Sequence, residues 1–486
     1  MRKKFYLIII FIFVSICMCA CQNNPKQTAV ISKNDGTFEA NVHQRSPQEE
    51  VHEISIKYDE QFSSTDDSVN FIMCLEQTIF NDLMPVVEVV PHSLTEIEVE
   101  NVAKVLLPNA VFFEQETDNN LKFSKAEIQD VINRWSEYAN QEAYSQLVGI
   151  DEVDWSDEIN ALKSKIQKYS ELLEKASEQN PHTVCEWTFK PENHYYSNRP
   201  YNNDIIQATT SLDGIDYVFN AVRRVKSDFI INGVTLSIGT NSFDRLIYRA
   251  LMCRTEKPTS LQLNTAEQKA QRMLDQMNLG EWKVQNAVVE IEYCGEIPEY
   301  SILVNADLIL EGISTLDGQR NPSLISEDTY SSNYYLTSAF FRFSPNGDLM
   351  YFGMDSPIDV DGVINDNVKT LPMEDLLGIA QDHLKLSDVY TNFGVPYGSV
   401  EECEEYSGEK LFGDVIISEV RYGLARIKIR NKDKNYYYVP AIALYGTVDY
   451  FGIQSGDFYI GSGQPYGDRV QAFVWVNAVD GSIIEN

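Results

Sequence analysis

The chain begins with a basic head followed by one unbroken apolar run. Arg2, Lys3 and Lys4 give the head its positive charge, and the apolar run spans Tyr6 to Met18, about thirteen residues. A helix needs ~20 apolar residues to cross the hydrocarbon core of a bilayer, so this run is short for a permanent span. A basic head before a short apolar run instead predicts an export signal over residues 1–20.

The residues after this run, Met18-Cys19-Ala20-Cys21, resemble the bacterial lipobox, with a methionine where leucine is more usual. The resemblance implies cleavage before Cys21 and transfer of a lipid to its thiol. It also implies that the mature protein is anchored on the outer face of the cell membrane, so that the membrane is one of its partners. An uncleaved N-terminal anchor is the alternative. Residues 21–50 are polar without periodicity, which predicts a disordered tether.

Residues 51–260 carry the first block of helix and strand patterns, and we expect them to form an N-terminal α+β domain. Met84 to Val90 is a continuous apolar strand, and Ser93 with Glu96 matches a capping box at the start of a helix. The apolar face of this helix is expected to comprise Ile97, Val99, Val102, Ala103 and Leu106. Residues 109–114 are expected to return as a strand.

Two longer helices follow in this block. Ser124 and Glu127 match a second capping box, and a helical pattern runs from about Ser156 to Ser177. We expect the pair to form a long helical hairpin. The apolar patterns after the hairpin predict strands over residues 183–189, 205–210, 217–225 and 229–238.

The pattern restarts near residue 260, after Lys257-Pro258-Thr259-Ser260, and residues 261–486 are expected to form a C-terminal α+β domain. Asn264 and Glu267 are interpreted as the cap of a helix that ends at Gly280. A second helix is expected over residues 373–384. Strands are expected over residues 282–293, 334–343, 349–353, 414–420, 425–430, 436–445 and 471–484. Helix followed by antiparallel meander, twice, predicts an α+β fold of meander sheets backed by helices, with at least two domains.

The helix Thr265-Ala266-Glu267-x-x-Ala270-x-x-Met273-Leu274 with its strand hairpin resembles the repeating units of PepSY-type exported modules. The ending Val476 to Ile484, after Tyr438-Val439-Pro440-Ala441, is similar to the final strands of YycI- and YycH-type extracellular regulatory proteins. The chain also resembles large uncharacterised lipoproteins of Gram-positive gut bacteria. These resemblances imply a non-enzymatic accessory or regulatory module outside the membrane.

The charge and the cysteine content of the chain limit the classes of function that it can have. Without the three basic residues of the head, 36 basic residues stand against 72 acidic ones, a net charge of −36. Such a chain is repelled by nucleic acid, so nucleic-acid binding is excluded. Beyond the signal and Cys21 the sequence names no disulfide partner for any remaining cysteine, and thiols in apolar runs, such as those of Cys74 and Cys253, are expected to be buried. The five remaining cysteines are Cys74, Cys185, Cys253, Cys294 and Cys403.

Local motifs for chemistry are weak. No H-x-x-x-H or H-E-x-x-H spacing occurs, and His182-x-x-Cys185 offers only two metal ligands. The segment Asp359-x-Asp361-Gly362-x-x-Asn365-Asp366 gathers oxygens but has its glycine at the fourth position of a calcium loop, not the sixth. Gly461-Ser462-Gly463 is neither a nucleophile elbow nor a phosphate loop, and residues 401–405 are interpreted as a solvated acidic loop. We therefore expect no catalytic, metal or cofactor residue.

Pairs and triplets of tyrosine are the remaining candidates for a site: Tyr195-Tyr196, Tyr334-Tyr335 and Tyr436-Tyr437-Tyr438. Rings near carboxylates suit stacking on sugars, but aromatic residues in strands usually pack into the core. The sequence therefore favours a non-enzymatic lipid-anchored envelope protein that binds or regulates another envelope protein or component. Two alternatives stay open: a lipoprotein that captures a carbohydrate or peptide, and a hydrolase using paired carboxylates.

Overall fold

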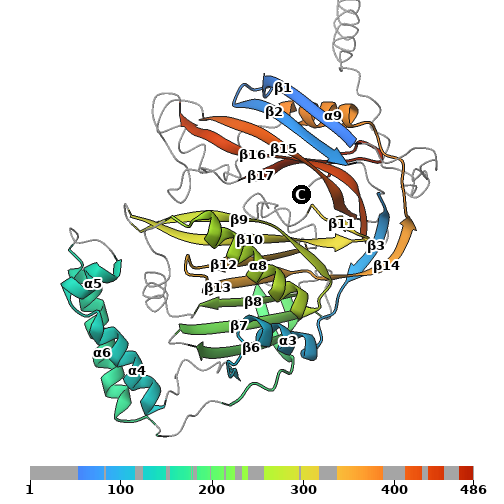
Figure 1. Cartoon of the computed structure of the whole chain (residues 1–486). Helices are drawn as coiled ribbons and strands as arrows, with labels where there is room; N and C mark the ends of the chain where they lie inside the picture. Colours follow the sequence, from blue (N-terminus) through green and yellow to red (C-terminus); the bar gives the residue numbers. More distant parts are fainter. Residues whose placement is uncertain are drawn as a thin grey trace, which may run out of the picture. The chain divides into compact units, whose positions relative to one another are not determined.

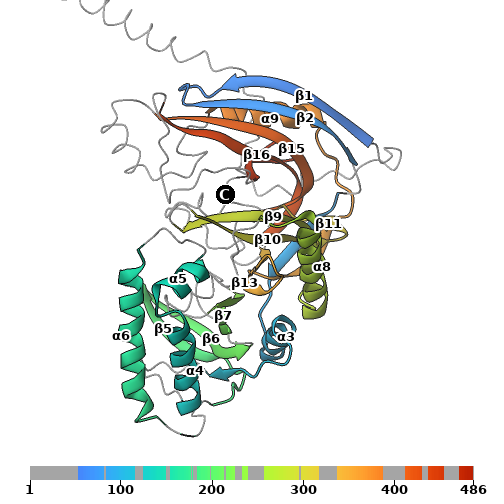
Figure 2. The same cartoon turned by 60° about the vertical axis from the view of Figure 1, so that its left-hand side comes forward.

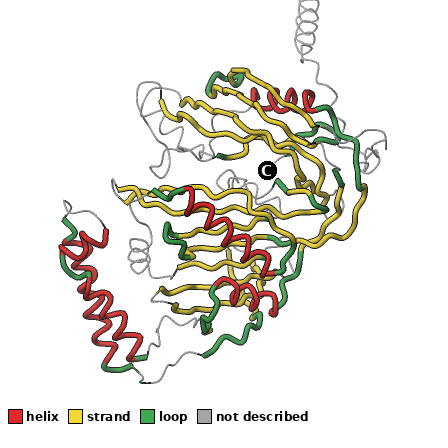
Figure 3. Tube along the Cα trace, in the orientation of Figure 1, coloured by secondary structure: helices red, strands yellow, loops and turns green. Residues whose placement is uncertain are grey.

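Two sheets and six helices make up the part of the chain that the computed structural model describes. This part comprises residues 53–80, 84–114, 124–148, 154–176, 178, 183–196, 199–212, 215–224, 232–238, 257–294, 297–316, 337–386, 411–428, 436–453 and 470–484. The chain divides into two units, residues 1–42 and 43–486, and all described residues lie in the second. The expected export signal, Cys21 and the tether lie outside the described residues. The fold is mixed, with mostly antiparallel sheets and few helices (Figure 3).

The larger sheet has ten antiparallel strands in the order β11-β10-β12-β13-β8-β7-β6-β4, with β9 beside β10 and β5 beside β6 (Figure 1). Its strands are β4 (Phe113–Glu114), β5 (Lys190–Tyr196), β6 (Arg199–Leu212), β7 (Ile215–Arg224), β8 (Gly233–Ile238), β9 (Glu281–Cys294), β10 (Ile297–Leu310), β11 (Ile313–Ser314), β12 (Ser338–Phe343) and β13 (Leu349–Asp355).

Two meanders join to form this sheet. One contains β5 to β8 and the other β9, β10, β12 and β13, and their last strands pair, with Gly233 opposite Asp355 and Ser237 opposite Tyr351. Each meander thereby covers one free edge of the other, which reduces the number of unpaired backbone groups. Strands from both sides of residue 260 consequently share one sheet.

The smaller sheet has seven strands in the order β1-β2-β15-β16-β3-β14, with β17 also paired to β16. Among the described strands of this sheet, only β2 and β15 pair in parallel. Its strands are β1 (Glu53–Ser63), β2 (Val69–Phe80), β3 (Val86–Pro91), β14 (Ile358–Asn365), β15 (Leu411–Lys428), β16 (Tyr436–Ile453) and β17 (Gln471–Asn477). This sheet too combines both halves of the chain. The strands therefore do not pair as two domains with separate sheets divided at residue 260, which the sequence had led us to expect.

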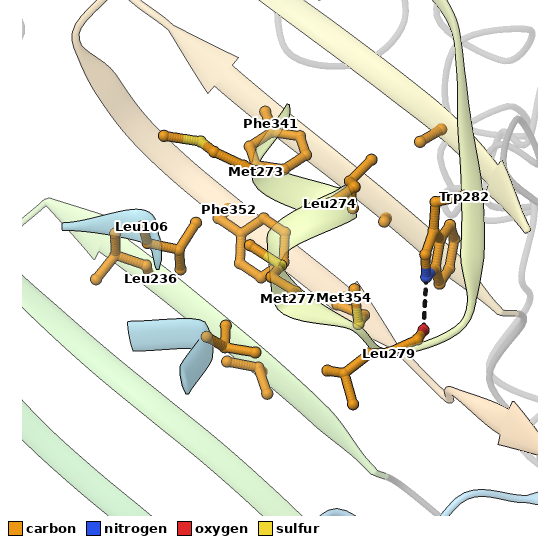
Figure 4. Close-up of a cluster of buried hydrophobic side chains, with 14 of the residues drawn as sticks. Leu106, Leu236, Met273, Leu274, Met277, Leu279, Trp282, Phe341, Phe352 and Met354 are labelled. Atoms are coloured by element: carbon orange, nitrogen blue, oxygen red, sulfur yellow. Dashed lines mark hydrogen bonds between the residues drawn. The ribbon is translucent and has the colours of Figure 1, made fainter. Parts of the chain in front are cut away.

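Helices α3 (Glu96–Leu106) and α8 (Ser260–Met277) cover one face of the ten-stranded sheet (Figure 2). Met273, Leu274 and Met277 of α8 pack with Phe341 and Phe352 of the sheet (Figure 4). All of these side chains are buried, and the indole N–H of the neighbouring Trp282 donates to the carbonyl oxygen of Leu279 at 2.8 Å. Burying large apolar side chains of this kind contributes ~1.5–3 kcal/mol each.

Helix α8 also satisfies backbone groups of β9, which lies at the edge of the sheet. The backbone N–H of Val284 donates to Oε1 of Gln271, and that of Ala287 donates to Oε1 of Glu267, both at 2.8 Å. Glu267 therefore binds a strand and does not cap the helix. These side chains occupy hydrogen-bonding positions that a further strand would use.

Two helices begin at a different residue from the expected one. The capping box of α3 is formed by Thr95 and Glu98, two residues after Ser93 and Glu96. This position leaves Leu94 before the cap, where it is buried with Val99 in the arrangement of a hydrophobic staple. It also leaves Ile97 78% exposed, contrary to the expectation that this side chain faces the core.

Helix α8 likewise begins earlier than expected. Its capping box is formed by Thr259 and Gln262, not by Asn264 and Glu267. The side-chain amide of Gln262 donates to the carbonyl oxygen of Pro345 at 2.6 Å, which ties the first turn of the helix to the turn between β12 and β13. The expected apolar positions Ala270, Met273, Leu274 and Met277 are all buried, as predicted.

Three helices, α4 (Lys125–Glu137), α5 (Gln141–Val148) and α6 (Ser156–Leu173), form a small cluster around Trp135, Ile159 and Leu162. The capping box of Ser124 and Glu127 is present as predicted. Because α5 stands between the other two helices along the chain, the segment is a three-helix unit and not the simple long hairpin expected from the sequence.

The seven-stranded sheet packs on α9 (Met373–Leu386), which buries Leu376, Leu377 and Ala380 against residues such as Phe71. The two sheets meet where β11 approaches β15. Thr315 forms a bridge with Leu424, and the backbone N–H of Leu316 donates to the carbonyl oxygen of Leu424 at 2.8 Å.

Several expected strands have other bounds. Residues 183–189 contribute only an isolated bridge at Val184, and residues 109–114 contribute only the two residues of β4. The two strands expected over residues 414–420 and 425–430 form one long strand, β15.

Candidate ligand-binding face

The ten-stranded sheet has a second face, opposite α3 and α8, which we call the polar face. Side chains alternate between the two faces of a strand. On β12, for example, Ala339, Phe341 and Phe343 belong to the core beneath the helices, while Phe340 and Arg342 point to the polar face and are half-buried.

Strand register aligns one row of side chains across seven strands of the polar face. The members of the row are opposite one another in successive strand pairs. From β9 to β6 the row is Asn286, Asn305, Phe340, Gly353, Thr235, Asn220 and Gln207. Four of the seven side chains are amides, each of which offers donors and an acceptor.

Two aromatic rings lie beside the glycine of this row. The rings of Phe340 and Tyr351 stack with centroids 5.2 Å apart and an interplanar angle of 16°. A Cβ atom on Gly353 would lie 2.8 Å from Cε1 of Phe340 and 3.1 Å from Cε1 of Tyr351, so both rings rest against the glycine. The absence of a side chain at position 353 therefore determines where the aromatic pair can lie.

The polar face also carries an ion pair and a desolvated carboxyl group beside the aromatic rings. Nη2 of Arg342 lies 2.6 Å from Oε2 of Glu290, so these two charges neutralise each other. Burial raises the pKa of the Asp355 carboxyl to about 6. Burial, together with the nearby Asp355, also raises the pKa of Tyr351. The aromatic pair thus lies between neutralised charges and a carboxyl group whose pKa is raised by burial.

The tyrosine triplet that the sequence offered as a candidate lies elsewhere. Tyr436, Tyr437 and Tyr438 are at most 3% exposed and belong to the protein interior, in agreement with the packing interpretation. The side chains of Tyr195 and Tyr196, and the whole of Tyr334-Tyr335, lie outside the described residues. So do Gly461-Ser462-Gly463, His182 and residues 401–405.

Two cysteines can be placed, and both are free. Cys185 is buried as expected, but Cys74 is exposed. Met73 and Leu75 of β2 point into the hydrophobic core. Strand alternation therefore turns Cys74 to the other side, where its thiol donates to Asp59 at 3.5 Å. Cys253, Cys403 and the side chain of Cys294 lie outside the described residues.

The acidic segment considered as a calcium loop lies in strand β14 up to Asn365. Asp359 pairs with Val90 of β3, and its carboxylate contacts Nδ1 of His92 at 2.9 Å. An extended strand spreads successive carboxylates apart and cannot wrap them around one ion. Within the described ranges, no group of three or more histidine, cysteine, aspartate or glutamate side chains is placed to hold a metal ion.

The polar face was not found from the sequence, although a signal for it exists. The strand before the turn at residues 345–348 alternates strictly between half-buried and buried side chains, and Phe340 and Arg342 occupy half-buried positions. That alternation identifies one face of a strand, but not which other strands extend it.

No helix in the described ranges is long and apolar enough to cross a membrane. No protein-family model matches the sequence, and a search of curated proteins gives no match either. Among solved structures, an uncharacterized protein from Eubacterium rectale ATCC 33656 is similar over 87% of this chain and 92% of that chain. The TM-score is 0.33 and the sequence identity 10%, a likeness too low to carry an argument about function.

Proposed function

We propose that this chain is a lipid-anchored envelope protein that binds another envelope component through the polar face, without catalysing a reaction. The observation that carries the proposal is the row across the face from Asn286 on β9 to Gln207 on β6, which holds four amides and has the Phe340–Tyr351 pair in its middle. Surfaces of this composition suit recognition because they combine hydrogen-bonding groups with rigid aromatic area.

The placement of Asp355 and Glu290 does not suit a hydrolytic pair of carboxylates. Asp355 has the raised pKa that a general acid needs, and Glu290 is the other carboxylate described above. However, β9 and β13 are separated by β10 and β12, so their backbones lie about 14 Å apart at the usual strand spacing. Paired carboxylates of glycosidases lie roughly 5–9.5 Å apart. Glu290 is also committed to Arg342.

The lipid anchor is supported by the basic head, the short apolar run and Cys21 in its lipobox-like context. We expect the wild-type chain to incorporate labelled palmitate and to fractionate with membranes, and Cys21→Ser to lose both properties. Unchanged mobility and membrane association of Cys21→Ser, together with no label in the wild type, would refute the anchor.

Binding through the polar face can be tested in intact cells with a photo-reactive amino acid at Asn220. A matched control carries the same amino acid at Glu76, on β2 of the other sheet. Cross-links to an envelope component should form from position 220 and not from position 76. Equal cross-linking from both positions, or none from position 220, would contradict the proposal.

A further inference from the structure

Backbone pairing determines how the polar face can recognise a ligand. The strands β10, β12, β13, β8, β7 and β6 each have a neighbour on both sides. Their backbone N–H and C=O groups are therefore used within the sheet, and a ligand on this face cannot add as a further strand. Recognition must depend on side chains.

The side chains offer neutral hydrogen-bonding groups toward both ends of the row. Asn305, Asn220 and Gln207 lie in one row, on β10, β7 and β6, and neighbouring strands are about 4.8 Å apart. Oδ1 of Asn286, at one end of the row, is buried without a hydrogen-bond partner among the described residues. A buried acceptor of this kind gains free energy when a ligand hydroxyl donates to it.

The aromatic pair supplies flat apolar area in the middle of the row. Phe340 and Tyr351 hold each other in place by stacking, and both rings lie against Gly353. Rings fixed by their neighbours lose little conformational entropy on binding a ligand, so they serve well as contact surfaces. The C–H groups of a sugar ring are a suitable apolar partner for such a surface, while its hydroxyls match the amides.

The charges argue against an ionic ligand. Arg342 is neutralised by Glu290 at 2.6 Å. The whole chain has a net charge of −33, which repels polyanions. A polycation would be recognised by carboxylates, whereas the row of this face is rich in amides.

We infer that the polar face binds a neutral polysaccharide, with Phe340 and Tyr351 stacking on one sugar ring and the amides of Asn305 and Asn220 hydrogen-bonding hydroxyls of other sugar units along the same polymer. This inference rests on the proposed binding function and specifies the ligand class. A protein partner is the competing outcome of the experiment below.

Affinity gel electrophoresis of the full chain tests the inference. The protein is kept in a detergent without a sugar headgroup, so that the detergent does not compete. The probes are the neutral polysaccharides laminarin, amylopectin, xyloglucan, galactomannan and arabinoxylan, and the anionic polymers polygalacturonate and chondroitin sulfate. We expect at least one neutral polymer to retard the wild type, and neither anionic polymer to do so.

The variants locate the site. Tyr351→Ala should weaken retardation by roughly tenfold in apparent Kd, as expected when a ring contact is lost. Tyr351→Phe keeps the ring and should retain binding. Tyr58→Ala, which removes a half-buried tyrosine of the seven-stranded sheet, should bind like the wild type. Thermal unfolding checks that each variant is folded.

Three results would overturn the inference: no retardation by any neutral polymer, retardation by the anionic polymers, or retention of binding by folded Tyr351→Ala. If the neutral polymers fail while position 220 still cross-links to an envelope protein in cells, the ligand class is wrong and the binding function stands. If both experiments fail, the proposed function itself is wrong.

Discussion

The side-chain amide of Asn101, on α3, donates to the carbonyl oxygen of Met277 at the last turn of α8, at 3.0 Å. The same amide lies 3.1 Å from the carbonyl oxygen of Gln276. The last carbonyls of a helix lack partners within the helix, so one side chain of α3 completes the end of α8.

Replacing Asn101 should therefore loosen the pair of helices that covers the sheet. We predict that Asn101→Ala lowers the free energy of unfolding by about 1 kcal/mol, the usual net contribution of a hydrogen bond. Asn101→Asp should lower the free energy of unfolding further, because a carboxylate near the negative end of a helix dipole is repelled. Urea unfolding of the full chain and the two variants measures the difference. Equal stability of all three would show that the amide contributes nothing.

His92 should give the stability of the fold a defined dependence on pH. Its ring nitrogens lie 2.9 Å from Asp359 and 3.2 Å from Glu98. Burial alone lowers the pKa of His92, but the hydrogen bonds to the two carboxylates outweigh it and raise the pKa above 6.5. Burial alone raises the pKa of Glu98, but the hydrogen bonds from Thr95 and His92 outweigh it and lower the pKa below 4.5.

The two shifts determine the pH range of this contribution. A raised histidine pKa contributes stability that is complete below the unfolded value and is lost as pH rises through the folded value. The lowered pKa of Glu98 contributes stability that is complete above about pH 4.5 and is lost as the pH falls through the folded pKa. Since all three groups are partly exposed, the contribution is about 1 kcal/mol or less. We predict that His92→Gln flattens the decline of stability above pH 6.5. An unchanged pH profile would contradict this.

Gly353 should be intolerant of a side chain. A Cβ atom there would lie 2.8 Å from the ring of Phe340, closer than real contacts allow. We predict that Gly353→Ala displaces the aromatic pair and lowers the free energy of unfolding by ~1–3 kcal/mol. Gly362→Ala on β14 is the matched control, because nothing lies within 4 Å of its Cβ position. Thermal unfolding compares the two, and equal melting temperatures would mean that the rings do not rest on the glycine.

The pairing of β8 with β13 predicts that the two halves of the chain depend on each other. Expressed separately, residues 51–260 and 261–486 would each leave strands of both sheets without their partners. We expect neither fragment to show the cooperative unfolding of residues 43–486, and co-expression to restore it. Cooperative unfolding of either fragment alone would show that the expected domain boundary at residue 260 separates independent folding units.

Local features were predictable from the sequence to the extent that local forces determine them. The capping box of Ser124 and the buried stripe of Ala270, Met273, Leu274 and Met277 follow from spacing alone. The start of α3 was misplaced because Ser93-x-x-Glu96 and Thr95-x-x-Glu98 match the same pattern, and burial of Leu94 favours the second.

Non-local features were not predictable from such patterns. The two meanders are joined because the edge strands β8 and β13 pair. The spacing of apolar residues along the chain does not determine which edge strands pair. The polar face depends on the same pairing, since Asn220 and Asn305 are 85 positions apart and share a row only through Thr235, Gly353 and Phe340. Cys74 shows the reverse error: its apolar neighbours suggested burial, but alternation in β2 turns it outward.

The central claim of this account is that the polar face binds its ligand without transforming it. The most direct test incubates the full chain with panels of glycoside, peptide and ester substrates and measures product release, alongside the double variant Asp355→Asn, Glu290→Gln. We predict no turnover by the wild type or the double variant on any panel. Saturable turnover by the wild type that disappears in the double variant would contradict the claim and identify the face as the active site of a carboxylate-dependent hydrolase.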